Sequence, residues 1–266
     1  MLAVILGASG AIGRSTVAKL LVRDYVVIAF VKDKIGEFSL LDYLAKSNVR
    51  VNLLYIFNAD FRQEDEISAI INKTEKLAKK FKGISLFVNC AGIYIKPSVN
   101  PRQDLNRIIN FEVPLKLFFS LTKNMNKDSR AIFIMPDFLR HNSFLQTLSK
   151  THKNYLNSKL ILMFNLLLWL KSGQNENVYF FIPKKTNSQF FVKNVTGLKR
   201  ILGQIRNIFS FPPEFSAEQI ITVATRKEFD GESGGIYYNL KPVPAPKFIQ
   251  NKKFAEKFNN LLLKIE

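Results

Sequence analysis

Residues 1–13, Met1-Leu-Ala-Val-Ile-Leu-Gly7-Ala-Ser-Gly10-Ala-Ile-Gly13, combine an apolar, strand-like run with three glycines spaced three residues apart. The residues that follow, Arg14-Ser-Thr-Val-Ala-Lys-Leu-Leu21, are typical of a helix. A tight turn between a strand and a helix suits a nucleotide pyrophosphate, because glycine lets the backbone approach the ligand and the helix N-terminus offers unpaired N–H groups. Glycine-rich turns also join strands to helices for packing alone. We predict a nucleotide-binding turn here.

Strand-like and helical segments alternate along the rest of the chain. The predicted strands are 2–6, 25–30, 51–57, 84–89, 131–135 and 178–182, and the predicted helices are 14–22, 40–45, 64–80, 105–123 and 153–171. Repeated strand–helix units indicate a parallel sheet covered by helices on both faces. Ligands of such sheets bind at the carboxyl ends of the strands, where the glycine turn is expected. No linker separates these units, so we expect a single domain.

The composition predicts a globular protein of a reducing compartment. With 266 residues, 47% of them hydrophobic, the chain can bury a sizeable core. Cys90 is the only cysteine, which excludes an internal disulfide framework and favours the cytoplasm. The longest apolar stretch, Leu160–Leu170, is about half of the roughly 20 residues that a membrane-spanning helix needs. Because the first strand starts at Leu2, we also expect no signal peptide.

The charge is strongly basic. Lysine and arginine number 39 against 21 acidic residues, which gives a formal net charge of +18. Such a charge attracts anionic partners such as phosphorylated cofactors, acidic proteins or acidic surfaces. A compositional bias toward Lys, Asn, Phe, Ile and Leu is the alternative explanation. The sequence contains no recognisable nucleic-acid-binding module, so nucleic acid is not an expected partner.

Further motifs follow the glycine turn in a fixed order. Asp60 ends the third predicted strand, Asn89-Cys-Ala-Gly92 follows the fourth, Asn110 lies on the next helix, and Tyr155-Leu-Asn-Ser-Lys159 lies on the helix after that. In this order and spacing, residues 1–240 resemble the short-chain dehydrogenase/reductases. The resemblance implies a Rossmann-type, doubly wound parallel α/β sheet and hydride transfer between a nicotinamide cofactor and a carbonyl or alcohol.

The Tyr–Lys pair has a chemical meaning of its own. Residues four apart share one face of a helix, and a lysine charge beside a tyrosine favours the phenolate, which suits general-acid work on a carbonyl oxygen. As the resemblance implies, Tyr155 donates the proton, Lys159 holds the nicotinamide ribose, and Asn110 supports a water chain to Lys159. Two exposed residues on a polar helix face are the structural alternative.

The resemblance also implies a set of cofactor-binding residues. They are Gly7, Ser9, Gly10, Ile12, Gly13, Arg14, Lys32, Asp60, Asn89, Ala91, Gly92, Tyr155, Lys159 and Pro183, with Asp60 at the adenine. A basic residue after the second strand suits the 2′-phosphate of NADP, whereas an acidic one suits NAD. Lys32 stands there, and Arg14 adds a second positive charge, which favours NADP. Asp33 leaves NAD possible.

The sequence departs from the family at two positions. The fifth strand ends in Pro136-Asp137-Phe138, without the serine that binds the substrate carbonyl in the family. Ser143 is the candidate replacement, because an ionised Asp137 accepts hydrogen bonds and would oppose an oxyanion. Lys184 replaces the glycine of the family's Pro-Gly pair after the sixth strand. A non-catalytic relative that serves as a nucleotide-binding or assembly subunit is therefore the alternative function.

We divide the chain into a domain at 1–246 and a basic tail helix at 247–266. Within the domain, 187–215 is the predicted substrate lid, whose interleaved phenylalanines and basic residues suit an anionic small molecule or, alternatively, a solvated helix face. Helices 105–123 and 153–171 are apolar over more than one face, which predicts a homodimer or tetramer. His141 and His152 lack a carboxylate pattern, so we expect no metal site.

Overall fold

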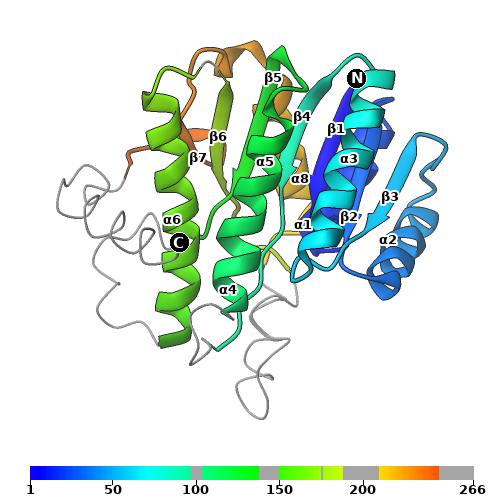
Figure 1. Cartoon of the computed structure of the whole chain (residues 1–266), viewed down its shortest axis with the longest axis horizontal. Coiled ribbons are helices and arrows are strands. Elements are labelled where there is room, and N and C mark those ends of the chain that lie inside the picture. Colours follow the sequence, from blue (N-terminus) through cyan, green and yellow to red (C-terminus); the bar gives the residue numbers. More distant parts are fainter. Residues whose placement is uncertain (97–103, 138–149, 175, 188–209, 246–266) are drawn as a thin grey trace.

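The computed structural model of the chain describes residues 1–96, 104–137, 150–174, 176–187 and 210–245. These residues form one eight-stranded sheet in the order β3-β2-β1-β4-β5-β6-β7-β8, with helices on both faces (Figure 1). All neighbouring strands are parallel except β7 and β8, which are antiparallel. The doubly wound sheet predicted from the sequence is confirmed.

The strands are β1 (Leu2–Leu6), β2 (Val26–Val31), β3 (Leu54–Asn58), β4 (Ile84–Asn89), β5 (Met125–Ile134), β6 (Asn177–Ile182), β7 (Ile236–Tyr238) and β8 (Lys241–Val243). The helices are α1 (Ala11–Leu21), α2 (Lys34–Lys46), α3 (Glu64–Lys80), α4 (Leu105–Arg107), α5 (Val113–Thr122), α6 (Lys150–Lys171) and α8 (Pro213–Thr225). A π-helical turn, Ile108–Glu112, joins α4 to α5, and a 3₁₀ turn at Lys227–Phe229 follows α8.

The strand order reverses between β1 and β4, which places the glycine turn at the switch point of the sheet. β1 pairs with β2 on one side and with β4 on the other. All five β1 side chains are fully buried, which explains why an unbroken apolar run rather than an alternating one forms this strand. Crevices at such switch points are where open α/β sheets bind ligands.

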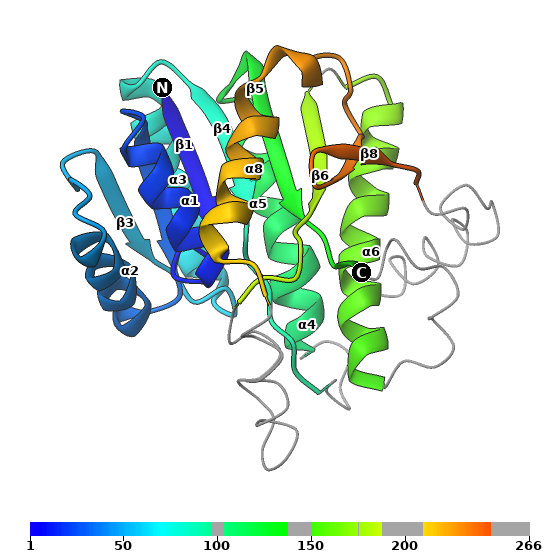
Figure 2. The ribbon, with the colours of Figure 1, turned by 180° about the vertical axis from the view of Figure 1, so that it is seen from behind.

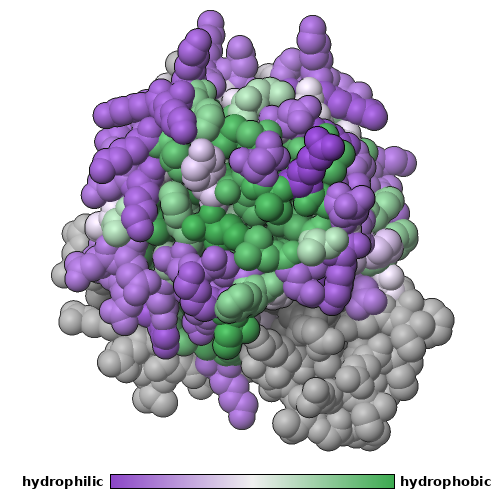
Figure 3. Space-filling view, turned by 90° about the vertical axis from the view of Figure 1, so that its right-hand side faces the viewer, coloured by the Kyte–Doolittle hydropathy of each residue, from purple (hydrophilic) through white to green (hydrophobic). Residues whose placement is uncertain are grey.

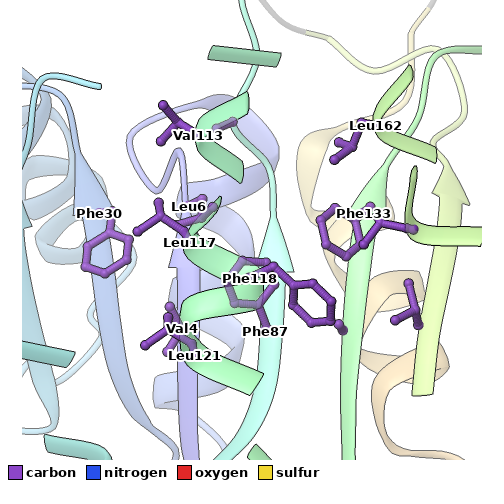
Figure 4. Packing of buried hydrophobic residues seen from close by; sticks show 14 of the residues in the cluster. Val4, Leu6, Phe30, Phe87, Val113, Leu117, Phe118, Leu121, Phe133 and Leu162 are labelled. Atoms are coloured by element: carbon purple, nitrogen blue, oxygen red, sulfur yellow. The ribbon is translucent and has the colours of Figure 1, made fainter. Parts of the chain in front are cut away.

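Two helical layers bury the faces of the sheet. α3, α5 and α6 cover the face seen in Figure 1, and α1, α2 and α8 cover the face seen in Figure 2. On the first face, Phe118 of α5 lies between Phe87 of β4 and Phe133 of β5, with both pairs of ring centroids 5.4 Å apart (Figure 4). Truncation of one such ring to alanine costs about 3–5 kcal/mol of stability in a close-packed core.

β3 is the open edge of the sheet. Its side chains from Leu54 to Phe57 are half-buried, although β1 and β2 are wholly buried. Figure 3 shows the side of the molecule that carries β3 and α2, where an apolar area lies between hydrophilic borders. α2 contributes the exposed side chains of Ile35 and Phe38 to this side of the fold.

The structure moves several of the predicted element boundaries. α2 begins at Lys34 rather than 40, because the Asp33 carboxylate caps the helix by accepting from the Gly36 N–H at 2.9 Å. β5 begins at Met125, six residues before the predicted strand. α8 and β7 were not predicted, and α8 starts at Pro213, inside the segment predicted as the lid. The predicted tail helix at 247–266 lies outside the described residues.

Within the part of the chain that the structure describes, no helix is both long and apolar enough to cross a membrane.

Candidate active site

The glycine turn between β1 and α1 requires glycine at two of its three positions. Gly7 has φ +70°, a left-handed conformation, and a Cβ there would lie 2.7 Å from the Cα of Ala91. A Cβ on Gly13 would lie 2.2 Å from the Gly7 carbonyl oxygen. Gly10 has more room, because its Cβ would lie 3.3 Å from the same oxygen. The turn therefore packs against the Ala91 backbone after β4 and against itself.

The N-terminus of α1 opens toward the carboxyl edge of the sheet. Gly10 is exposed, whereas Ser9 and Ile12 are half-buried. Gly10 is the N-cap of α1, and no side chain of the described residues caps this end. The free N–H groups of the first helical turn, together with the positive end of the helix dipole, favour an anionic group here.

Arg14 lies in a small polar cluster rather than at the tip of the turn. Its guanidinium carbon lies 4.8 Å from the ring centroid of Tyr43 on α2. The Tyr43 hydroxyl donates to Glu214 at 2.6 Å, and the Ser15 hydroxyl donates to the same carboxylate at 3.2 Å. The cluster thus joins α1 and α2 to the first turn of α8.

The residues after β2 and β3 lie side by side at the same edge. Lys32 is exposed, and the Asp33 carboxylate serves as the cap of α2. Asp60 accepts from the side chain and the backbone N–H of Arg62, with the backbone bond at 3.0 Å. The Arg62 side chain is the main cause that lowers the pKa of Asp60, and Lys32 adds a smaller effect of the same sign. Lys32 is therefore close enough to Asp60 to affect its charge.

The segment after β4 lies between the glycine turn and α6. The Asn89 side-chain oxygen accepts from the Ala91 N–H at 3.1 Å, while its buried amide nitrogen has no hydrogen-bond partner among the described residues. Burial raises the pKa of the Cys90 thiol to about 12, so this thiol is protonated at neutral pH. A Cβ on Gly92 would lie 3.6 Å from the Lys159 Nζ, so no side chain separates them.

Tyr155 and Lys159 are both buried, so they are not the exposed pair of the structural alternative. They lie one turn apart on α6, with exposed fractions of 7% and 2%. The Lys159 Nζ donates to the Ala91 carbonyl at 2.9 Å. Burial lowers the pKa of Lys159 to about 8 and raises the pKa of Tyr155 above its ordinary value. The sequence-based expectation that the lysine charge lowers the pKa of this phenol is therefore wrong, because burial of the phenol outweighs the charge. At neutral pH the site therefore holds a protonated phenol beside a lysine that releases its proton more readily than usual.

Asn110 fastens the segment after β4 to the helices. It is fully buried in the π-helical turn. Its side-chain oxygen accepts from the Ile93 N–H at 2.7 Å, and its amide donates to the Ile93 carbonyl at 2.9 Å and to the Ser158 hydroxyl at 3.2 Å. Ser158 donates in turn to the Tyr155 carbonyl at 2.7 Å. Both N–H groups of the Asn110 amide are thus used by this scaffold.

Asn106 makes a second connection of the same kind, which we did not predict from the sequence. Its amide donates to the Ile95 carbonyl at 3.1 Å, and its oxygen accepts from the Ile95 N–H at 3.4 Å. Asn106 is fully buried and precedes Asn110 by four residues. Two asparagines at this spacing share a helix face, and that spacing was the signal available in the sequence.

The end of β5 carries no hydroxyl group among the described residues. Met135 donates its N–H to the Phe181 carbonyl at 2.8 Å, and Met135 and Pro136 are buried. Asp137, the last described residue here, is exposed. Ser143 and His141 lie outside the described residues, so the structure does not place the proposed replacement serine.

The end of β6 also departs from the expected pattern, because Lys184 stands in place of a glycine. Pro183 and Lys184 are half-buried, and the Lys184 Nζ lies 4.6 Å from the ring centroid of Phe211. Asn187 donates its N–H to the Phe211 carbonyl, and Phe211 donates its N–H to the Lys185 carbonyl, both at 2.8 Å. These two bonds join the residues on either side of 188–209.

Together these features fit a bound dinucleotide. The turn carries glycine at residues 7, 10 and 13, the start of α1 has no side-chain cap, and the buried Asn89 amide has no hydrogen-bond partner among the described residues. Buried amides normally have partners, so this one is available to a ligand. A doubly wound sheet with such a turn at its switch point, and a buried Tyr–Lys pair beside it, defines a Rossmann-type dinucleotide-binding domain.

The chain belongs to the short-chain dehydrogenase family. The family model described as short chain dehydrogenase matches residues 1–151, more than half of the chain. The matched region contains the glycine turn, Asp60, the 89–92 segment and Asn110, and it ends before Tyr155. No curated protein matches the sequence.

Solved structures share the fold at low sequence identity. A dehydrogenase/reductase from Sinorhizobium meliloti superposes with a TM-score of 0.69 at 18% identity, covering 88% of this chain and 91% of that one. A short-chain dehydrogenase/reductase of unknown function from Caenorhabditis elegans, solved with cofactor, has a TM-score of 0.71 at 17% identity, with 88% and 91% covered. The angucycline C-6 ketoreductase LanV, with bound NADP, has a TM-score of 0.69 at 18% identity, with 88% and 92% covered.

Proposed function

We propose that this protein is an NADP(H)-dependent oxidoreductase that reduces a carbonyl group, or oxidises the corresponding alcohol, on a small molecule. The observation that carries the proposal is the buried Tyr155–Lys159 pair, fastened to the backbone that packs against the glycine turn. If these two side chains were exposed, they would indicate only the polar face of a helix. Burying a lysine and a phenol costs free energy, and such perturbed groups cluster at functional sites.

Each residue has a defined task in this proposal. The first turn of α1 binds the pyrophosphate, and Lys159 holds the nicotinamide ribose. NADPH, when bound, supplies the hydride. Tyr155 gives its phenolic proton to the substrate oxygen, and the raised pKa of Tyr155 keeps that proton in place at neutral pH. A protonated phenol is the form that can act as the acid in carbonyl reduction.

The preference for NADP rests on the end of β2. Lys32 is exposed beside Asp60, where a 2′-phosphate would gain a charge-assisted contact. Asp33, the residue that left NAD possible, is engaged as the cap of α2. LanV, which shares the fold, holds NADP. Arg14 is directed toward Tyr43 and supplies charge at longer range.

Association into a homodimer or tetramer belongs to the same proposal. The outer faces of α5 and α6 expose Phe119 and Leu168 by 36% and 39%, next to the half-buried Trp169. Exposed apolar side chains on adjacent helices are typical of an association surface. The free Cys90 suits a reducing compartment such as the cytoplasm.

The second candidate is a nucleotide-binding or assembly subunit without catalytic activity. It is favoured by the end of β5, where Met135 and Pro136 fill the place at which the family has its substrate-binding serine. Lys184 also favours this second candidate. It stands where the family has a glycine, and its Nζ lies over the ring of Phe211.

Two measurements separate the candidates. Titration of the protein with NADPH and NADH, followed by nucleotide fluorescence, is expected to give micromolar NADPH binding and much weaker NADH binding. Tyr155→Phe is then expected to lower kcat by about 10²–10⁴-fold, with the NADPH Kd unchanged, because only the proton donor is lost. NADPH binding without turnover of any carbonyl compound would support a nucleotide-binding subunit without catalytic activity. Binding of neither nucleotide would refute the oxidoreductase and support the assembly subunit.

A further inference from the structure

The extended segment after Gly92 is held by side chains instead of by a neighbouring strand. Asn110 pairs with both backbone groups of Ile93, and Asn106 pairs with both backbone groups of Ile95. In an extended chain the backbone groups of alternate residues point to the same side. The backbone groups of Ile93 and Ile95 therefore point to the two asparagines, and Tyr94 lies between two anchored residues.

Tyr94 contacts the proposed proton donor directly. Its ring centroid lies 5.9 Å from that of Tyr155, with the two rings edge to face at 82°. Because Asn106 and Asn110 are fully buried, moving the segment would leave polar groups unpaired in the interior. The tertiary structure thus holds a second phenol beside Tyr155 before any ligand binds.

The described residues at the end of β5 offer no side-chain donor to the same site. Residues 135–137, at the end of β5, are Met, Pro and Asp, and none can donate a side-chain hydrogen bond when the aspartate is ionised. A carbonyl oxygen that gains negative charge needs donors aimed at it. One donor, Tyr155, is assigned in the proposed function, and residues 135–137 supply no other.

We infer that Tyr94 lines the substrate subsite and donates the second hydrogen bond to the reacting oxygen. This inference rests on the proposed function, because it assigns a further residue to the same reaction. During reduction the carbonyl carbon receives the hydride of NADPH, and the oxygen receives the proton of Tyr155. Tyr94 keeps its own proton throughout, so its role is to stabilise the oxygen as charge develops.

The experiment compares Tyr94→Phe with Tyr55→Phe. Tyr55 of β3 is also half-buried and also packs its ring on another aromatic ring, that of Phe81 at 6.1 Å, but it lies on the open edge of the sheet. With the best substrate from a panel of ketones and aldehydes, Tyr94→Phe is expected to lower kcat by about 10²-fold, the cost of one lost oxyanion donor. Tyr55→Phe should leave kcat unchanged, and both variants should keep the wild-type NADPH Kd and Tm.

A measurement on the free protein tests the ring contact by itself. In protein labelled with ¹³C at the tyrosine ζ carbon, Tyr94→Leu should shift the Tyr155 signal, assigned by its loss in Tyr155→Phe, and Tyr55→Leu should not. An unshifted Tyr155 signal in Tyr94→Leu would show that the two rings are not in contact and would overturn the inference.

The kinetic outcomes are equally decisive. Wild-type kcat in Tyr94→Phe, together with a large loss in Ser143→Ala, would assign the donor to Ser143 and refute the role of Tyr94. If the wild-type protein binds NADPH but reduces no carbonyl compound, the proposed function fails and this inference fails with it. A loss in Tyr94→Phe but not in Ser143→Ala supports it.

Discussion

After β1 the chain turns within Gly7–Gly13, and after β5 it continues through Met135 and Pro136 to Asp137. Both ends lie at the same edge of the sheet and serve the same proposed site. At β1 two of the three motif glycines are required, because a Cβ at Gly7 or Gly13 would overlap backbone atoms. At β5 the family serine is replaced by residues that pack into the interior.

The difference follows from the kind of interaction that each end makes. The turn after β1 is shaped by backbone contacts, and a backbone cannot be exchanged for another chemical group. The end of β5 contributes one side-chain donor in the family, and a donor can be supplied from another element, here Tyr94. Nucleotide binding therefore depends on steric requirements, whereas substrate chemistry depends on which side chains converge.

The largest expected effect tests the steric side of this comparison. Gly13→Ala places a Cβ within 2.2 Å of the Gly7 oxygen, so the turn must open. We expect a stability loss of about 3 kcal/mol or more and loss of NADPH binding, measured by denaturant unfolding and fluorescence titration. Gly10→Ala is the matched control, because the closest contact there is 3.3 Å, and it should cost about 1 kcal/mol or less. Equal effects of the two substitutions would show that the turn has no special steric requirement.

The next effect concerns the buried lysine. The pKa of Lys159 falls from 10.5 to about 8 on folding, so between these pH values the unfolded chain binds more protons than the folded one. Stability from this group therefore rises with pH across that window, by up to about 3 kcal/mol in total. The free energy of unfolding of the wild type relative to Lys159→Met should increase from pH 8 to pH 10.

Lys46→Met is the control for this pH dependence, since Lys46 is exposed and paired with Asp42 at 2.7 Å. The difference in free energy of unfolding between the wild type and Lys46→Met measures the effect of removing a surface lysine. A wild-type–Lys159→Met difference that stays constant over the same pH range would contradict the burial of the lysine charge.

The smallest effect concerns cofactor choice. Lys32→Ala should weaken NADPH binding by about fivefold, the size expected for an exposed charge pair, and should leave NADH binding unchanged. Lys34→Ala removes a lysine two residues away that pairs with Glu37 at 2.8 Å, and it should change neither affinity. Equal weakening of NADPH and NADH by Lys32→Ala would show that Lys32 does not read the 2′-phosphate.

Local signals predicted most of the strands and helices, and tertiary contacts decided those that were missed. The strands β1, β2 and β4 can be recognised in the sequence as apolar runs, because central strands bury both faces. β7 has only three residues and pairs with β6, too short a run to show a pattern. The start of α2 depends on a cap by Asp33, a residue that the sequence pattern linked only to the choice between NAD and NADP.

The sequence by itself determined the family, the sheet class and the identities of the glycine turn and the Tyr–Lys pair, because these depend on residue types at fixed local spacing. Only the tertiary structure decided that Tyr155 and Lys159 are buried, that Arg14 is directed toward Tyr43, and that Asn106 and Asn110 hold Tyr94 against Tyr155. Burial and contact join residues far apart in the chain, here from α2, the segment after β4 and α6. No local pattern encodes such a distance, so the arrangement of the site emerges only when the chain is folded.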